Sequence, residues 1–174
     1  MRKHEFKNRM RRRAGFTLSE TLIAVLILLM VSAVVAAGVP VAAGVYEKVV
    51  RGANAQVLLS TAMTELRDEL GTATDVRVEN GTTIHYRSGD GSDTTIYLNG
   101  GVIYIQEYVG LSDSENFRHP LVSNAAADGE LKASYGTVEL NDGVLTFSGL
   151  VVQKDGNTVA NAPTYQVRVL TYVP

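Results

Sequence analysis

The 174-residue chain contains no cysteine. A disulfide framework and a thiolate metal site are therefore both excluded. A domain exported without disulfides must depend on its hydrophobic core alone. The three histidines, His4, His85 and His119, show no metal-ligand spacing, so we expect each to be structural or solvated.

Recognisable catalytic motifs are also missing. The sequence contains no nucleophile elbow, phosphate-binding loop or zinc-protease motif, and we predict that the protein is not an enzyme and has no cofactor. The segment DGSD at residues 90–93 offers two carboxylates, whereas calcium takes six to eight oxygen ligands. We therefore interpret this segment as a polar turn and predict no metal site.

Charge is unevenly distributed along the chain. Residues 1–15 carry seven Lys/Arg and one acid, whereas residues 47–174 carry nine Lys/Arg and sixteen Asp/Glu. The two ends are expected to meet different surroundings. The acidic C-terminal region disfavours a nucleic-acid-binding surface there, because phosphates would be repelled.

Residues 21–46 contain no charged side chain. As a helix, 26 residues extend about 39 Å at roughly 1.5 Å per residue, which exceeds a hydrocarbon core of roughly 30 Å. The basic residues before this segment favour a cytoplasmic N-terminus, with the residues after about 46 outside. A cleaved secretory signal is one interpretation, although its apolar region usually has only about 7–15 residues. An uncleaved signal anchor is another.

Glu20 needs a separate explanation, because it lies at the start of the apolar segment. A carboxylate deep in a bilayer costs roughly 2.5–3.5 kcal/mol on insertion scales. Glu20 therefore either lies at the headgroup edge without a role or awaits a positively charged partner.

The segment GFTLSE at residues 15–20, followed by TLIAVL at residues 21–26, resembles the type III signal sequence of type IV prepilins and pseudopilins. That pattern is a short basic leader ending in Gly, then Phe-Thr-Leu, one variable residue, Glu and a long apolar helix. The resemblance covers roughly residues 9–46. It implies that a prepilin peptidase cleaves between Gly15 and Phe16 on the cytoplasmic side and then N-methylates Phe16.

The resemblance also implies that Glu20 pairs with the amino terminus of a neighbouring subunit during assembly. The methylated amine of Phe16 stays cationic, and a buried carboxylate or ammonium is costly when isolated. A pair across two subunits offsets both costs, and losing one partner would leave an uncompensated charge. The pair would thereby set the register between subunits.

The chain departs from the family pattern in two places. Its leader of fifteen residues is longer than the shortest leaders of the family, and Pro40 lies three residues later than the proline that major pilins often have. Proline removes a helical hydrogen bond and clashes with the preceding turn. We therefore predict a helix kink at Pro40, as a bend or a melted stretch near residues 36–40.

A helical pattern continues over residues 46–70. Apolar residues recur at three- and four-residue steps, which predicts an amphipathic helix packed on a sheet: Tyr46, Val49, Val50, Ala53, Val57, Leu59, Ala62, Met63, Leu66 and Leu70. Gly71 is the expected stop. One helix from about Phe16 to about Leu70 follows from both segments.

After Gly71 the apolar period changes to two. Predicted strands cover residues 75–80, 82–87, 94–98, 102–108, 137–140, 144–152 and 165–173, and tight turns such as Asn80-Gly81 join them. Sequential hairpins indicate an antiparallel sheet. Residues 110–136 are predicted to form a surface loop with one short element. The tyrosines of this region could pack half-buried or contact neighbouring subunits or a ligand: Tyr86, Tyr97, Tyr104, Tyr108, Tyr135, Tyr165 and Tyr172.

The predicted fold is therefore α+β and pilin-like: a leader at residues 1–15, a transmembrane and assembly helix at 16–46, and a soluble head at 47–174 whose helix (47–70) packs on an antiparallel sheet (75–173). The resemblance implies a structural filament subunit, a minor pilin or pseudopilin of a pilus, type II secretion or competence-type system. Its expected partners are prepilin peptidase, other pilin subunits, an inner-membrane assembly platform and the cytoplasmic membrane, and its final location is the cell surface. One alternative is a monomeric membrane-anchored extracellular domain that binds a ligand. Another is a β-rich domain released by ordinary signal peptidase.

Overall fold

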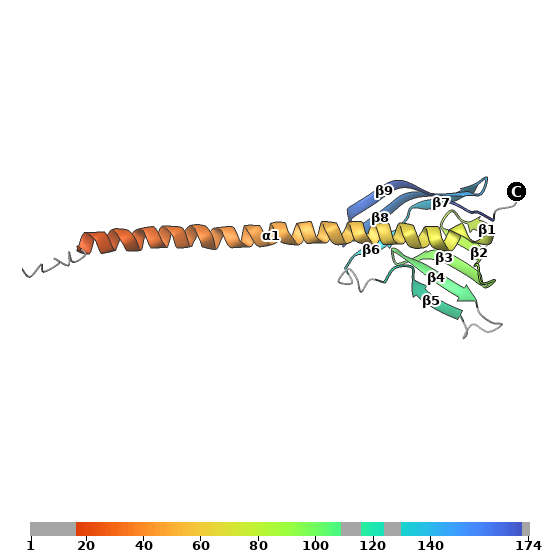
Figure 1. Ribbon diagram of the computed structural model, residues 1–174, viewed down its shortest axis with the longest axis horizontal. Coiled ribbons are helices and arrows are strands. Elements are labelled where there is room, and N and C mark those ends of the chain that lie inside the picture. Colours follow the sequence, from red (N-terminus) through yellow and green to blue (C-terminus); the bar gives the residue numbers. More distant parts are fainter. Residues whose placement is uncertain (1–16, 109–115, 124–129, 172–174) are drawn as a thin grey trace, which may run out of the picture. The chain divides into compact units, whose positions relative to one another are not determined.

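The computed structural model describes residues 17–108, 116–123 and 130–171. These residues form one α-helix and nine β-strands (Figure 1). The chain divides into two units, Met1–Tyr46 and Glu47–Pro174. Helix α1 (Leu18–Gly71) begins in the first unit and ends in the second.

In the first unit, every described residue is exposed. Leucine, isoleucine, valine and alanine dominate here, and the most apolar window of α1 has a mean hydropathy of 3.0 with none of its residues buried. By length and composition the helix can cross a membrane, a test that a signal sequence near the N-terminus would also pass. Its exposed apolar surface is therefore available to lipid or to another apolar partner.

Pro40 lies inside α1, and the helix continues through it without interruption. The melted alternative at residues 36–40 is therefore wrong, because all five residues are helical. A bend at Pro40 stays a prediction.

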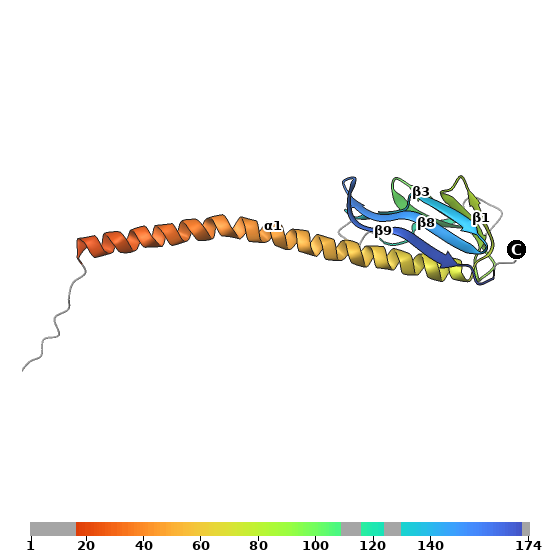
Figure 2. The same ribbon diagram turned by 90° about the horizontal axis from the view of Figure 1, so that it is seen from above.

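In the second unit, the end of α1 packs against the strands, which lie on one side of it (Figure 2). The buried helical residues follow the spacing of one helix face: Ala55, Leu58, Leu59, Ala62, Leu66 and Leu70. The predicted packing face began too early, since Tyr46 and Val49 are 71% and 64% exposed, and it wrongly included Val57, which is 62% exposed although Ala55 and Leu58 are buried. Periodicity identified a helix with an apolar stripe but not the residue at which the sheet begins to cover it.

Five strands form the first sheet in the order of the sequence, and all their pairings are antiparallel. They are β1 (Thr74–Glu79), β2 (Thr83–Arg87), β3 (Asp93–Asn99), β4 (Val102–Tyr108) and β5 (Asn116–Pro120). The turn from β1 to β2 confirms the predicted hairpin, because Asn80 and Gly81 have φ values of 53° and 67°. The connection comprises residues 80–82, and the Thr82 N–H donates to the carbonyl of Glu79, so Asn80 and Gly81 are the central residues of a β-turn whose type requires positive φ at both.

The second sheet is built around the long strand β8. Its strands are β6 (Lys132–Ser134), β7 (Thr137–Asn141), β8 (Val144–Lys154) and β9 (Asn157–Arg168). Both β6 and β7 pair with β8, at different stretches of that strand, and β9 also pairs with β8. The predicted single sheet is thus two antiparallel sheets, both belonging to the head.

One hydrophobic core joins α1 to both sheets. Leu66 of α1, Ile84 and Ile96 of the first sheet, and Leu145 and Phe147 of the second are all fully buried and belong to one cluster. Hydrogen bonds also connect the sheets, and two of them involve the turn between β1 and β2. The Val138 N–H donates to the carbonyl of Gly81 at 2.8 Å, and the Tyr135 hydroxyl donates to the carbonyl of Thr82 at 2.7 Å.

Two parts of the strand prediction were wrong. The predicted loop over residues 110–136 contains two strands, β5 and β6, instead of one short element. The last strand, β9, begins at Asn157 rather than Tyr165 and ends at Arg168. Pro163 lies inside β9, and proline is tolerated on an edge strand, where the missing N–H faces no partner. The described pairings of β9 are with β8 alone.

Candidate functional site

The N-terminal end of α1 contains the described part of the predicted processing and assembly site. Gly15 and Phe16, the predicted cleavage and methylation positions, lie outside the described residues. Thr17 and Glu20 are described and fully exposed. What the structure adds at this end is a specific pairing between these two residues.

Thr17 and Glu20 cap the helix reciprocally. The Thr17 N–H donates to Glu20 Oε2 at 2.8 Å, and the Glu20 N–H donates to Thr17 Oγ1 at 3.3 Å. The Thr17 hydroxyl also donates to Glu20 Oε2 at 3.0 Å. This is a capping box, in which residues three apart satisfy N–H groups that the first turn leaves unpaired. Sequence reasoning missed it, although the Thr-x-x-Glu spacing was present to indicate it.

The capping box changes the interpretation of Glu20. Before assembly, its carboxylate already has hydrogen-bond donors within its own chain, which lowers the cost of placing it near lipid. A carboxylate has two oxygens and about four acceptor sites. Oε2 takes the capping bonds, so Oε1 can still accept from a second group.

A second group of functional side chains lies on the first sheet, on the side opposite its buried residues. Residues paired directly across antiparallel strands share a face. The strand register therefore places five polar side chains in one row across β1 to β5: Arg77, His85, Thr95, Gln106 and Arg118. A neighbouring row contains Arg87, Asp93 and Tyr108. We call the surface formed by these two rows, together with Tyr97 and Tyr104, the polar face.

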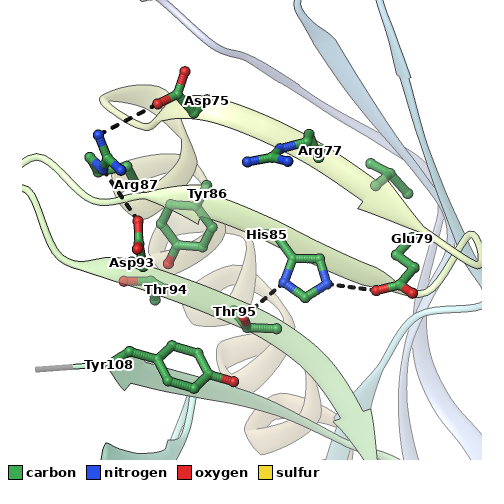
Figure 3. Close-up of a pocket in the computed structure, with 11 residues that line it drawn as sticks. Asp75, Arg77, Glu79, His85, Tyr86, Arg87, Asp93, Thr94, Thr95 and Tyr108 are labelled. Atoms are coloured by element: carbon green, nitrogen blue, oxygen red, sulfur yellow. Dashed lines mark hydrogen bonds and ion pairs between the residues drawn. The ribbon is translucent and has the colours of Figure 1, made fainter. Parts of the chain in front are cut away.

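One end of the polar face contains a hollow of about 560 Å³, lined by residues of β1 to β4 (Figure 3). His85 lies between two partners, with Nδ1 3.0 Å from Thr95 Oγ1 and Nε2 2.9 Å from Glu79 Oε2. Arg87 lies between two carboxylates, with Nε 3.2 Å from Asp93 Oδ1 and Nη1 3.7 Å from Asp75 Oδ2. His85 and Arg87 are therefore held by the carboxylates of the hollow.

The order Thr95–His85–Glu79 matches the hydroxyl–imidazole–carboxylate order with which enzymes activate a nucleophile. Thr95 is only 6% exposed, so its hydroxyl is closed to a substrate. The hydrogen bond between Thr95 and His85 instead fixes the His85 imidazole over the sheet. His85 is structural, as the sequence predicted, but it also lines the hollow.

At the other end of the polar face, an arginine lies on two tyrosine rings. The Tyr97 and Tyr104 rings stack at 6.0 Å between centroids, and the Arg118 guanidinium carbon is 5.4 Å and 5.0 Å from these centroids. Such cation–π contacts hold a flexible side chain in place at the surface.

The structure divides the tyrosines that sequence reasoning left open. Tyr86, Tyr135 and Tyr165 donate hydrogen bonds to Glu69, to the carbonyl of Thr82 and to the carbonyl of Met63, and their partial burial raises the pKa of each hydroxyl. Tyr97, Tyr104 and Tyr108 lie on the polar face, and their hydroxyls have no hydrogen-bond partner among the described residues. Tyr172 lies outside the described residues.

The turn at residues 90–93 is polar, and Asp90 forms its hydrogen bonds within the turn. Asp90 Oδ1 accepts hydrogen bonds from the Ser92 N–H at 2.9 Å and the Ser92 hydroxyl at 2.6 Å, which lowers the pKa of the Asp90 carboxyl. Asp93 instead contacts Arg87. Within the part of the chain that the structure describes, no group of three His, Cys, Asp or Glu side chains is placed to hold a metal ion.

Comparison with known proteins identifies the N-terminal segment. Residues 10–36 match the family described as the prokaryotic N-terminal methylation motif. The matched segment includes Gly15, Phe16 and Glu20, as well as the capping residue Thr17. No curated protein and no solved structure matched the chain. The chain thus carries the prepilin-type N-terminal methylation motif on a long helix that packs against antiparallel sheets, a pilin-like α+β fold.

Proposed function

We propose that this protein is a prepilin, the membrane-stored precursor of a structural subunit of a type IV pilus or of a type II secretion or competence-type filament. The observation that carries the proposal is the methylation motif at residues 10–36. It is joined to an apolar helix whose residues are all exposed as far as Tyr46, the end of the first unit. An exposed apolar helix needs lipid before assembly and other apolar helices after it. In a filament, the apolar helices of neighbouring subunits at the core supply this environment after assembly.

In this proposal, prepilin peptidase removes residues 1–15 and methylates Phe16. The mature subunit then leaves the cytoplasmic membrane through an inner-membrane assembly platform and joins other pilin subunits, with its head at the cell surface. Glu20 keeps its capping hydrogen bonds to Thr17 through Oε2, and its Oε1 accepts a hydrogen bond from the Phe16 amine of a neighbouring subunit. Its role is structural, and no catalytic step is assigned to the chain.

The identity of the mature N-terminus tests this proposal against its alternatives. Mass spectrometry of protein from its native cell should detect N-methylated Phe16 as the first residue. An intact Met1 would support a membrane-anchored domain that does not polymerise, and a start near residue 44 would support a secreted domain. Processing should stop when a bulky residue precedes the cut, so full cleavage of Gly15→Leu would contradict recognition by prepilin peptidase.

Two substitutions separate the charge of Glu20 from its capping role. Glu20→Gln keeps a side chain that can complete a capping box but removes the charge. Thr17→Val removes the capping hydroxyl but keeps the charge. If the intersubunit pair sets register, Glu20→Gln is cleaved normally but enters filaments poorly, while Thr17→Val enters them well. Equal loss in both variants, measured by counting subunits in purified filaments, would assign the effect to helix capping.

A further inference from the structure

The polar face carries side chains that nothing in the filament role uses. Its hollow is open to solvent, because the side chains of Arg87, His85 and Glu79 are 50%, 43% and 62% exposed. Its volume of about 560 Å³ lies within the range of roughly 300–1,000 Å³ typical of small-molecule sites.

The lining of the hollow alternates hydrogen-bond donors and acceptors. Arg77 and Arg87 supply donors, and Asp75, Glu79 and Asp93 supply acceptors. Arg87 and His85 are already held by neighbouring carboxylates. Binding would therefore order few additional side chains, and this pre-organisation lowers the entropic cost of association.

Two groups that line the hollow are unsatisfied. Among the described residues, the Arg77 guanidinium and the Tyr108 hydroxyl have no partner. Figure 3 shows them on opposite sides of the hollow, with Arg77 of β1 beside His85 and Tyr108 of β4 beyond Thr95. Tyr108 is 41% exposed, so its ring also offers an apolar surface at the edge of the hollow.

The charges of the lining select the class of ligand. Two arginines face three carboxylates, so the carboxylates of the lining outnumber its arginines. A polyanion such as a nucleic acid would be repelled, and a purely apolar ligand would leave charged groups desolvated. A hydroxyl both donates and accepts a hydrogen bond, so a ligand rich in hydroxyls suits paired cations and carboxylates.

We propose that the polar face is a carbohydrate-binding site for neutral sugars. Hydroxyls of one sugar unit bond to Arg77 and the neighbouring carboxylates, while a second unit of the same oligosaccharide packs a C–H face on the Tyr108 ring and bonds to its hydroxyl. The stacked Tyr97 and Tyr104, with Arg118 across them, continue the same face and provide a second surface for a longer glycan. No covalent step is involved.

The site is tested with the full-length chain in phosphatidylcholine nanodiscs, which lack sugar headgroups. The probes are a panel of neutral oligosaccharides built from glucose, galactose and their N-acetylated amines, a sialylated oligosaccharide and a single-stranded oligonucleotide. At least one neutral oligosaccharide should bind, and its titration should shift the NMR signals of the His85 imidazole and the Tyr108 ring. The Phe117 ring should not respond, because Phe117 pairs with Glu107 on the opposite face of the same sheet.

Matched variants then locate the binding. Arg77→Ala and Tyr108→Ala should each weaken the neutral sugar at least about tenfold, which corresponds to roughly 1.4 kcal/mol. Arg168→Ala and Phe117→Ala remove an exposed arginine and an exposed aromatic ring outside the polar face and should leave affinity unchanged. Near-ultraviolet circular dichroism confirms that each variant is folded.

Three outcomes would overturn the proposal. They are the absence of binding by every neutral sugar, binding confined to the sialylated or nucleic-acid probe, and equal binding by all four variants. None depends on filament formation, so failure here leaves the prepilin proposal intact. Conversely, an intact Met1 in the native protein would contradict the prepilin proposal and leave the sugar-site proposal unaffected.

Discussion

Residues 18–46 and residues 55–70 belong to one continuous helix, yet their apolar side chains have opposite environments. In the first segment every residue is exposed, and the helix is apolar on all sides. In the second, most apolar side chains form one buried face, and the remaining faces are largely polar apart from the exposed Val57. A helix that is apolar all round has to be buried in something, whereas an amphipathic helix finds its partner in its own domain.

The comparison indicates that the two segments obtain their stability from different sources. The head has a core of its own that includes Leu66 and Phe147. The first segment has no buried residue, so its apolar surface needs lipid or another apolar partner to cover it. A substitution should therefore affect membrane insertion or head stability according to its segment.

The largest effect is expected from a charge in the middle of the apolar segment. Val34 and Val57 are both exposed valines of α1, at 73% and 62%. Val34→Arg should reduce membrane partitioning about 100-fold, because arginine at a membrane helix centre costs roughly 2.5–3.5 kcal/mol. Val57→Arg is the matched control and should partition normally. Equal loss of membrane-bound protein in cell fractionation would remove the distinction between the segments.

A core truncation in the head should have the opposite selectivity. Phe147 is fully buried, and its ring meets the Tyr135 ring edge-on with 5.3 Å between the ring centroids. Phe147→Ala should therefore lower the free energy of unfolding by about 3–5 kcal/mol. Phe117 is 62% exposed, and Phe117→Ala should change stability by less than about 0.5 kcal/mol. Urea unfolding followed by near-ultraviolet circular dichroism measures both, and both variants should remain in the membrane. If Phe147→Ala left stability unchanged, the head core would be wrongly placed.

The smallest effect concerns a surface ion pair of the head. Lys154 hydrogen-bonds to Glu130 and lowers the pKa of its carboxyl. A carboxyl whose folded pKa lies below its unfolded pKa adds stability above the unfolded value, and this stability is lost as pH falls through the folded pKa. Lys154→Gln should thus be slightly less stable than the wild type at pH 7, and this difference should be smaller at pH 3, as the Glu130 carboxylate becomes protonated.

The control for this pair is Lys132→Gln, because Lys132 donates to the carbonyl of Gly100 and forms no ion pair with a carboxylate of the described residues. Its urea midpoint should differ from that of the wild type by the same amount at pH 7 and at pH 3. A pH-dependent difference of similar size in both variants would mean that general charge, rather than the Glu130 pair, is responsible.

Local patterns were sufficient to predict most of the fold. The long helix followed from residues 21–46 and from the spacing of Leu59, Ala62 and Leu66, and the hairpins followed from turns such as Asn80-Gly81. The start of β9 was missed, and the tolerance of Pro163 on an edge is known only once β8 is paired. The burial of residues 46–57 was misjudged because periodicity cannot say where a sheet ends.

The candidate sites differ in the same way. The motif at residues 15–20 is contiguous, so the sequence alone was enough to identify it, and its capping box could have been identified from Thr17 and Glu20. The polar face combines residues from five strands. Arg77 and Arg118 are 41 positions apart in the sequence, and only the pairing of β1 through β5 places them in one row.

By itself the amino-acid sequence determined the apolar helix, the methylation motif, the hairpin turns and the α+β class, because each depends on neighbours within a few residues along the chain. The tertiary structure decided which part of α1 is covered, that the strands form two sheets, and that Arg77, His85 and Tyr108 share one surface. These features depend on strand register and on contacts between distant segments, which a one-dimensional pattern does not encode.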